Sequence, residues 1–515
     1  MLWLALHLPQ LSLEAFCATL DAAQQQRPVA LIAEHRVKTV NRIAAERGIR
    51  PGAKRATALA LAADLLAAEA EPARDAAALR AVAYAALGFT PSVCLQGEQT
   101  VLLELQSCLR LFGGLAALGQ RLSGVLAPLG HRVCMAAAPT AWGAALLAQW
   151  HPRDRGSLVE GAHATQLPAL QRLLDAAPVW LLGPGREHWE ALQGMGLHQL
   201  SDLRALPRGG LARRFGAALL DDLDRALGLQ PDPRRWLELP AVFDSRLELF
   251  SRAENTEQVL HGAGVLLARL VAWAQARQSR VAAFTLRMLH ERQRRAEAAP
   301  TELHVELAEP ALDPAHLQLL LRERLARVTL AAPTLELQLQ CRQLVAAPAP
   351  NAELFPTRAS EAEGLTRLIE RLRARLGDGQ VTHLLPVADY RPERASRAVP
   401  ATGGGGLPAA ALASVATALQ ALQATALPFH RPAWLLPEPL PLAEAEEEPT
   451  PLLDGRPLLL LSGPERIETG WWDGGTVARD YYIAQAHDDS LVWIYHGRLG
   501  TPRGEPNWYL QGRFG

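Results

Sequence analysis

Cysteine is scarce in this chain. It has five cysteines, an odd number, and none of them lies in a Cys-x-x-Cys spacing. This pattern argues against a zinc site and against a disulfide framework. No stretch approaches an apolar membrane-spanning run, and the apolar start is interrupted by His7 and Pro9 without a basic leader. We therefore expect a core strand at the start and a reducing, cytoplasmic location.

Lysine and net charge are also scarce. Of 52 basic residues only Lys38 and Lys54 are lysines, and the formal net charge is −1. Without a global positive field, any contact with nucleic acid must come from local patches. Arginine suits phosphate groups, although the codon bias of a GC-rich genome is the simpler explanation for its abundance.

Length and periodicity predict several modules. A chain of 515 residues is too long for one core, so three or more modules are expected. Strand patterns alternate with helix patterns in the first part, which predicts an α/β layer; the strands are expected at 1–9, 28–33, 102–105 and 132–138, and the helices at 11–23, 40–46, 56–68, 74–87, 114–129 and 141–150. Only short helices are expected over 165–235. Residues 240–345 then show the order βαββαβ, which closes a compact α+β unit.

The second half contains clear breaks. A Pro- and Ala-rich linker is expected over 346–359, followed by a helix within the segment 360–400. A flexible stretch is expected over 401–452, between a run of four glycines and a glutamate-rich run. Residues 453–515 are rich in aromatic and strand-forming residues, which predicts a small β unit.

Four motifs carry a resemblance to a known family. The opening strand Trp3 to Pro9, the strand Thr100 to Leu105, the Leu-Phe-Gly-Gly at 111–114 and the Arg-Arg-Phe-Gly at 213–216 resemble the skeleton of Y-family DNA polymerases. In that family the first strand carries a metal-binding Asp and the second an adjacent Asp-Glu pair. His7 stands where the first Asp is expected, and Gln99 and Thr100 stand where the pair is expected. Two-metal phosphoryl transfer needs carboxylates at these places, so the resemblance implies a degenerate site with no catalytic residue, no metal and no cofactor.

The same resemblance implies a domain plan. Residues 1–10 and 75–164 would be palm-like, 11–74 fingers-like, 165–235 a helical thumb-like region and 240–345 little-finger-like. The fold class expected is α/β and α+β multidomain, with a C-terminal extension.

Two further motifs narrow the resemblance to one subset. Pro386 to Arg394 and Gly463 to Gly475, which contains Gly-Trp-Trp-Asp-Gly-Gly, have no counterpart in ordinary Y-family polymerases. They resemble the ImuB-type, catalytically inactive, polymerase-like proteins of bacterial mutagenesis cassettes. That resemblance implies a non-catalytic accessory scaffold for error-prone translesion DNA synthesis in the SOS response, nucleoid-associated in the cytoplasm. Its implied partners are damaged or primed DNA, the β sliding clamp, a RecA-like ImuA-type protein and a C-family error-prone polymerase docked on the 453–515 tail.

Two other functions stay open on the sequence alone. An active Y-family translesion polymerase would need Glu98 or Glu104 as a metal ligand, with the strand alignment shifted by one or two residues. A DNA-binding module with no role in replication would lack clamp binding.

Two regions are candidates for DNA contact. Gly194 and Gly196 flank a turn between helical stripes, which indicates a helix-hairpin-helix whose backbone amides meet a phosphate; a plain helix–helix turn is the alternative. Downstream arginines that could add phosphate contacts are Arg208, Arg213 and Arg214. Residues 269–295 hold seven arginines and one acid, a basic cluster or else a solvated surface; the members expected to contact DNA are Arg280, Arg287, Arg292, Arg294 and Arg295.

The linker and the tail carry interaction signals. The stretch Asn351 to Pro356 places Leu354 beside Phe355, and it resembles the Gln-x-x-Leu-Phe motif that binds bacterial sliding clamps, with Asn351 in the place of Gln. Local packing is the alternative. Of the tail aromatics, most are expected to be core residues rather than platforms for single-stranded bases; they are Trp471, Trp472, Tyr481, Tyr482, Trp493, Tyr495, Trp508, Tyr509 and Phe514.

Overall fold

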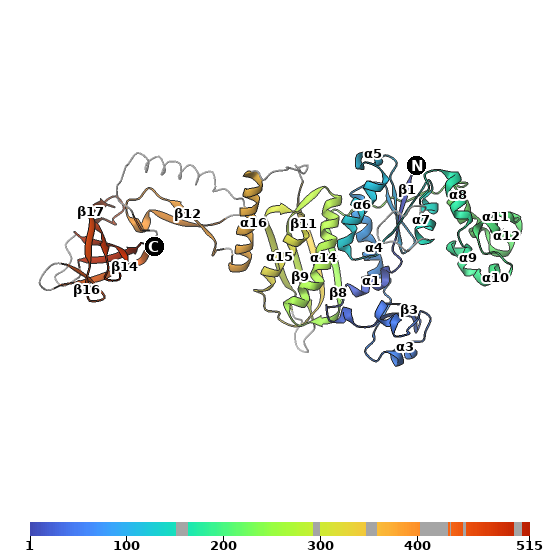
Figure 1. Ribbon diagram of the computed structural model, residues 1–515, viewed down its shortest axis with the longest axis horizontal. Coiled ribbons are helices and arrows are strands. Elements are labelled where there is room, and N and C mark those ends of the chain that lie inside the picture. Colours follow the sequence, from blue (N-terminus) through green and yellow to red (C-terminus); the bar gives the residue numbers. More distant parts are fainter. Residues whose placement is uncertain are drawn as a thin grey trace. The chain divides into compact units, whose positions relative to one another are not determined.

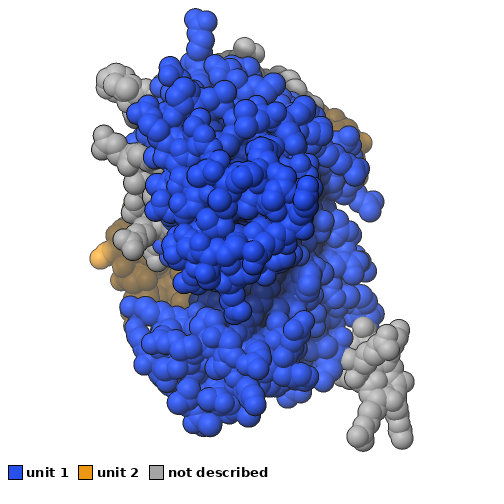
Figure 2. All heavy atoms as spheres, turned by 90° about the vertical axis from the view of Figure 1, so that its right-hand side faces the viewer, with its two compact units in different colours: residues 1–357 blue, residues 358–515 orange. Residues whose placement is uncertain are grey.

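The computed structural model describes residues 1–150, 163–291, 299–346, 358–377, 379–401, 431–432, 434–445, 450–498 and 507–514. The chain forms two compact units, unit 1 (Met1–Thr357) and unit 2 (Arg358–Gly515), which Figure 2 colours separately. The boundary falls inside the predicted linker 346–359.

Unit 1 contains a four-stranded antiparallel sheet in the order β5-β6-β1-β7 (Figure 1). Its strands are β1 (Trp3–His7), β5 (Val93–Gln96), β6 (Thr100–Glu104) and β7 (Cys134–Ala138), and its main helices are α1 (Leu11–Cys17), α4 (Pro72–Leu87), α5 (Leu109–Phe112), α6 (Leu115–Leu126) and α7 (Ala141–Trp150). Successive side chains point to opposite faces of a strand. Leu4 and Leu6 pack with α4 and α6, whereas Trp3 and Ala5 pack with α7. His7 continues the Trp3 and Ala5 series and so lies on the α7 face.

A smaller sheet of unit 1 has the order β3-β2-β4, with β2 and β4 parallel. Its elements are β2 (Val29–Ala33), β3 (Arg36–Val40), α2 (Arg42–Glu46), α3 (Arg55–Leu61) and β4 (Leu66–Glu69). The prediction of one helix over 56–68 is wrong, because the chain leaves the helix after Leu61 and enters β4. Pairing with β2 overrides the helix propensity of the Leu-Ala-Ala-Glu sequence.

Short helices follow, as the sequence predicts. They are α8 (Leu167–Asp175), α9 (Gly183–Glu187), α10 (Trp189–Gly194), α11 (Leu200–Ala205), α12 (Arg208–Phe215) and α13 (Ala217–Leu227). Their leucine stripes join the apolar cluster beneath α7, so this helical region shares a core with one face of the four-stranded sheet.

The last part of unit 1 has the element order βαββαβ. Its elements are β8 (Phe243–Ala253), α14 (Thr256–Ala276), β9 (Ser279–His290), β10 (Thr301–Ala311), α15 (Pro314–Leu325) and β11 (Thr334–Ala346). The antiparallel sheet has the order β10-β9-β11-β8, which leaves β8 at one edge. Helix α14 contacts both this sheet and α4.

Helix α14 corrects one expectation. Among the described residues it is the one helix long and apolar enough to cross a membrane by length and composition, whereas the sequence was expected to hold no such stretch. Two thirds of its most apolar window is buried. Because it packs against the sheet on one side and α4 on another, an apolar character on several faces is what a core helix needs.

The described residues of unit 2 form one long helix and two sheets. The elements are α16 (Arg358–Leu376), β12 (Thr382–Pro386), β13 (Ser396–Pro400), β14 (Trp434–Glu444), β15 (Pro451–Leu453), β16 (Arg456–Pro457), β17 (Leu459–Thr469), β18 (Val477–Gln485), β19 (Leu491–Gly497) and β20 (Trp508–Arg513). Strands β12 and β13 pair with each other, and the larger sheet has the order β16-β15-β14-β20-β19-β18-β17.

Strand β14 corrects the expectation of a flexible stretch over 401–452. It pairs with β20 at Trp434 and Leu435 and again at Leu440 to Leu442, with a register shift between. Pro437 and Pro439 fall inside that shift, where a missing N–H interrupts no ladder bond. The predicted fold class, α/β and α+β multidomain with a β-rich C-terminal extension, is confirmed.

Candidate nucleic-acid interface and polymerase-like site

The β1–β6 ladder brings two of the degenerate positions together. His7 pairs with Thr100 in the antiparallel register, and the His7 Nδ1 lies 3.0 Å from the Thr100 Oγ1. Both side chains are buried. Gln99 is half-buried in the preceding turn, where its carbonyl oxygen accepts a hydrogen bond from the Leu8 N–H at 2.8 Å.

Burial sets the charge of this pair. It lowers the pKa of His7 from 6.5 to about 4, with a smaller contribution from the positive charge of Arg186. The imidazole is therefore neutral at physiological pH. A neutral imidazole and a hydroxyl give Mg²⁺ no negative charge, whereas hard divalent cations prefer carboxylate oxygens. Chemically, this pair suits a hydrogen-bonded core contact rather than a metal site.

Of the two acids considered as metal ligands, Glu104 is separated from that position. Glu104 pairs with Trp3 at the far end of β1, four residues from the His7–Thr100 pair, or about 13 Å along the strand. Its Oε1 accepts a hydrogen bond from the Gln106 N–H. Glu98 lies exposed in the turn before β6. Among the residues that the structure describes, no group of three or more His, Cys, Asp or Glu side chains could hold a metal ion.

The predicted hairpin lies between α10 and α11. Gly194 ends α10, and Gly196 takes a positive φ of 76°. Every backbone N–H from Met195 to Leu200 already donates within the chain: Met195 and Leu197 to Leu192 O, Gly196 to Gln193 O, His198 and Gln199 to Asp202 Oδ2, and Leu200 to Ala177 O. The Asp202 carboxylate, whose pKa these amide bonds lower, occupies the place of an anion at the start of α11. This arrangement favours the plain helix–helix turn.

The three downstream arginines differ in whether their side chains form ion pairs within the chain. Arg208 begins α12 and pairs with the buried Asp224 at 2.5 Å, which joins α12 to α13. Arg213 and Arg214 lie exposed in the last turn of α12. Of the three, Arg213 and Arg214 therefore remain accessible.

The basic cluster of 269–295 does not form one surface. Arg269 is buried, and Arg277 lies over the Trp273 ring and donates to Pro240 O at 2.8 Å. The expectation of a surface arginine is wrong for Arg269, because α14 is a core helix. Arg280 is half-buried at the start of β9. Three further members, Arg292, Arg294 and Arg295, lie outside the described residues.

The side of the β8–β11 sheet opposite α14 is polar, and we call it the open face. Arg287 lies at its centre and bonds Glu302 Oε1 at 2.8 Å and Gln338 Oε1 at 3.0 Å. The ladders place Arg246 beside Gln338. A hollow of about 450 Å³ on this face is lined by residues that include Arg287, His304 and Arg342.

Sequence reasoning missed Arg246 and Arg342 as members of this face. Both arginines lie outside the 269–295 window. The pairing of β8 with β11 brings Arg246 onto the open face. The alternation of polar and apolar residues along β8 and β11 was the available signal. The clamp-motif residues Asn351, Leu354 and Phe355 lie outside the described residues.

In unit 2 the two subset-specific motifs meet. Arg391 is 3% exposed, and its Nη2 bonds Asp389 Oδ2 at 2.7 Å and Asp473 Oδ2 at 2.6 Å. Its Nη1 donates to the Gly475 carbonyl at 3.1 Å. The guanidinium holds the pKa values of both carboxyls below the usual range. We call this cluster the arginine lock; it fastens the segment before β13 to the turn between β17 and β18.

Most of the tail aromatics are core residues, as predicted. Tyr481 and Trp493 stack with ring centroids 4.2 Å apart, and Tyr495 and Trp508 are also buried. The exceptions are Trp471 and Trp472, which are 71% and 58% exposed on the turn that the arginine lock holds.

Comparisons with known proteins agree with the sequence motifs. No family model matches the chain. It is 29% identical over 485 residues to "Protein ImuB" of two Caulobacter vibrioides strains, NA1000 / CB15N and ATCC 19089 / CIP 103742 / CB 15, a match covering 91% of this chain and all of each relative. The predicted resemblance to an ImuB-type, polymerase-like protein is thereby confirmed.

Solved structures give weaker matches. DinB from Sulfolobus solfataricus is 15% identical with a TM-score of 0.37, covering 68% of this chain and 100% of that one. A Dbh ternary complex is 14% identical with a TM-score of 0.38, covering 67% of this chain and 99% of that one.

Proposed function

We propose that the chain is a non-catalytic accessory scaffold for error-prone translesion DNA synthesis. It holds primer–template DNA and the sliding clamp while a separate error-prone polymerase copies past the lesion. The similarity to ImuB over 91% of the chain supports a polymerase-related role. The observation that carries the non-catalytic part is the buried, neutral His7–Thr100 pair.

The chemistry of the His7–Thr100 pair argues against catalysis at this position. Polymerases of this kind stabilise the charge of a transferring phosphoryl group with metal ions held by carboxylates. A carboxylate placed at position 7 would be buried beside a hydroxyl and near the positive charge of Arg186, which binds no metal ion. The residues present instead satisfy each other, so the strands that would carry a catalytic centre form a closed core.

DNA binding is proposed for the open face of the β8–β11 sheet, with Arg213 and Arg214 as additional contacts. Arginine and amide side chains suit phosphate and sugar atoms, which carry no sequence information. Because the chain has no net positive charge, binding depends on these local cations and weakens steeply with salt.

The DNA part is tested by fluorescence anisotropy of a labelled primer–template between about 50 and 200 mM salt. The triple variant Arg287→Ala, Arg294→Ala and Arg295→Ala should flatten the salt dependence, by about 0.9 in the logarithmic slope for each lost phosphate contact. Arg397→Ala, an exposed arginine of β13, is the matched control. An unchanged slope in the triple variant would remove this region from the DNA interface.

The clamp part is tested by retention on an immobilised bacterial sliding clamp. Leu354→Ala with Phe355→Ala should abolish retention, because the two apolar side chains supply most of the contact. Leu459→Ala with Leu460→Ala, a pair of exposed leucines on β17, is the control and should be retained like the wild type. Retention of the Leu354 and Phe355 double variant would place the clamp motif elsewhere.

The opposing function is an active translesion polymerase that uses Glu98 or Glu104. It predicts Mg²⁺-dependent primer extension that disappears in Glu104→Ala or Glu98→Ala.

A further inference from the structure

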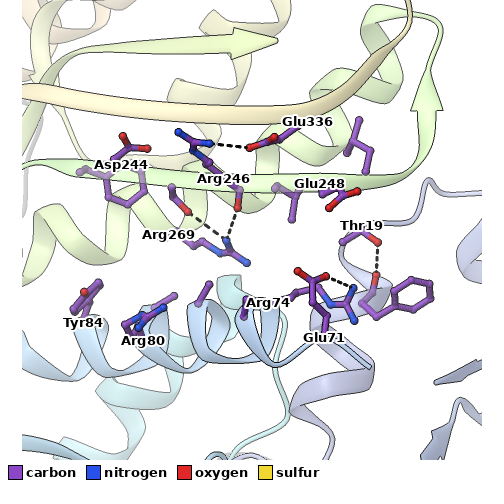
Figure 3. A pocket seen from close by; sticks show the side chains of 18 of the residues that line it. Thr19, Glu71, Arg74, Arg80, Tyr84, Asp244, Arg246, Glu248, Arg269 and Glu336 are labelled. Carbon is purple, nitrogen blue, oxygen red and sulfur yellow. Dashed lines mark hydrogen bonds and ion pairs between the residues drawn. The ribbon is translucent and has the colours of Figure 1, made fainter. Parts of the chain in front are cut away.

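A groove runs between the edge strand β8 and helix α4 in unit 1. Its volume is about 750 Å³, within the range of binding pockets. Figure 3 shows α4 along one side of the groove and β8 along the other. Because β8 is the last strand of its sheet, the backbone along this side faces the groove rather than another strand.

One buried cation of the groove has only neutral partners. Arg269 is 7% exposed, and its Nη1 donates to Ser245 Oγ at 3.3 Å and to Arg246 O at 3.4 Å. Within the part of the chain that the structure describes, no acidic side chain pairs with it. Burial without an ionic partner lowers the pKa of Arg269 to about 10. A buried guanidinium of this kind is stabilised by an incoming carboxylate.

Helix α4 adds further donors to the groove. The Nε and Nη2 of Arg74 are buried without a hydrogen-bond partner. Arg80, at the middle of the helix, and Tyr84, about one turn later, also line the groove (Figure 3), and no described residue pairs with either side chain.

The acids of the groove are mostly engaged. Glu336 pairs with Arg246 at 3.6 Å and Glu71 with Arg74 at 3.2 Å. Asp244 accepts hydrogen bonds from the amides of Gln338 and Gln340. Glu248 is left without a described partner, so free donors outnumber free acceptors and the groove suits an acceptor-rich ligand.

The shape favours an extended chain. Ala73, Ala77 and Ala81 line the α4 side and leave room beside the strand. At the far end of the groove the Phe250 N–H already donates to Thr19 O at 3.3 Å, so this edge of β8 accepts a backbone partner there. An added strand bonds to such an edge through its main chain, while its side chains supply specificity.

We propose that this groove binds an extended peptide of a partner protein, which adds a strand to β8 and places an acidic side chain against Arg269 and Arg80. The acidic side chain is chosen to complement Arg80 and Arg269, two guanidinium groups of the groove that have no ionic partner among the described residues. The proposal goes beyond the scaffold function. Because Arg246 lies both on the open face and in the groove, the tests change Ala77 and Arg80, which are not assigned to DNA, so the proposal can fail independently of that function.

The first test pans a phage-displayed library of random linear peptides against the full-length chain. Ala77→Trp, which fills the groove, is the comparison target, and its circular dichroism and thermal unfolding are checked against the wild type. Peptides with an acidic residue should be enriched on the wild type over Ala77→Trp. If none is enriched, the proposal is wrong.

The second test measures the affinity of the enriched peptide by fluorescence anisotropy. Arg80→Glu should weaken binding by about tenfold or more, because it reverses a charge facing the peptide. Arg110→Glu, an exposed arginine on α5, should bind like the wild type. Equal binding by Arg80→Glu and wild type would overturn the proposal.

Hydrogen exchange separates strand addition from simple anion binding. Bound peptide should protect the amides of β8 facing the groove, between Asp244 and Leu249. Inorganic phosphate should compete weakly and protect none of them. If phosphate alone reproduces the protection, or if the peptide protects no β8 amide, the groove is an anion site or no site, and the strand-addition proposal is overturned.

Discussion

The region around β1 and the region around the turn after β17 differ in whether they bury charged side chains. In the first, the residues at the polymerase-like position are a buried, neutral imidazole and hydroxyl. In the second, a buried guanidinium joins two carboxylates and a carbonyl from segments about eighty residues apart in sequence. The first region packs these side chains without charge, while the second keeps buried charge to hold a turn in shape.

The consequence of this difference is a separation of roles. A neutral pair inside a core supports packing and has no capacity for phosphoryl transfer. The arginine lock, by contrast, presents Trp471 and Trp472 on a turn whose geometry is fixed by ionic bonds. Exposed aromatic side chains on a rigid support are typical of interaction surfaces, which agrees with the proposed accessory role.

The largest expected effect comes from removing the guanidinium of the arginine lock. Arg391→Met should leave Asp389 without its cation and Asp473 with the exposed Arg394 alone, and a broken buried pair is strongly destabilising. The thermal midpoint of unit 2, measured by tryptophan fluorescence, should fall by about 5 °C or more. Arg397→Met is the control and should unfold like the wild type. An unchanged midpoint in Arg391→Met would mean that the lock is a surface feature only.

Acid should weaken the same cluster. The folded pKa values of Asp389 and Asp473 lie below their unfolded values, so the contribution of the lock is complete above about pH 4 and is lost as the pH falls below it. Unfolding midpoints measured from pH 6 to pH 3 should drop for wild-type unit 2 and drop less for Arg391→Met. Parallel curves for the two proteins would contradict the assignment.

The next effect concerns His7. Its folded pKa of about 4 lies below the unfolded value of about 6.5, so the unfolded chain takes up a proton first as the pH falls. The stability of unit 1 should therefore be complete above about pH 6.5 and fall by up to about 3 kcal/mol between pH 6.5 and pH 4.

His7→Gln is the matched variant for this effect, because it keeps a hydrogen-bonding side chain that does not titrate. Urea midpoints of unit 1 at pH 7 and pH 4.5 should differ less in His7→Gln than in the wild type. An equal difference would show that another group causes the pH dependence.

The smallest effect is expected for Thr100→Val. The substitution keeps the shape of the side chain but removes the partner of His7 Nδ1, which should cost about 1 to 2 kcal/mol in the free energy of unfolding. Urea denaturation at pH 7 measures it. A cost near zero would mean that the imidazole finds another partner, and the neutral pair would then be incidental.

Much of the fold follows from the sequence, and the failures have local causes. The element order over 240–345 and the short helices after 165 were predictable because their apolar periodicities are strong. Strand β4 was missed because Leu66 to Glu69 has the propensity of a helix, and only its partner β2 makes it a strand. Strand β14 was missed because its prolines indicate a linker, and the register shift that accommodates them is a tertiary feature.

The candidate sites divide in the same way. The prediction that His7 and Thr100 stand in the places of metal-binding carboxylates came from the sequence, because each position lies on a recognisable strand. Their mutual hydrogen bond required the ladder register. The burial of Arg269 was not predictable from a count of arginines, since it depends on α14 packing against two partners.

The contacts of the arginine lock were not predictable, although its motifs were visible in the sequence. Both motifs that form it were recognised in the sequence as features of the same type of protein. Nothing in either motif alone showed that Arg391 and Asp473 make direct contact. The two residues are 82 positions apart in the sequence, and local propensity carries no information about such a contact.

Primer extension tests the central claim most directly. The purified chain is added to a labelled primer–template with all four deoxynucleotides and Mg²⁺ or Mn²⁺, and the same preparation is assayed for a mobility shift of that DNA. We expect a shift and no extension, with Glu98→Ala and Glu104→Ala indistinguishable from the wild type. Extension that disappears in either variant would contradict the account, because a metal site would then exist beside the two strands whose His7 and Thr100 we assign to a neutral core pair.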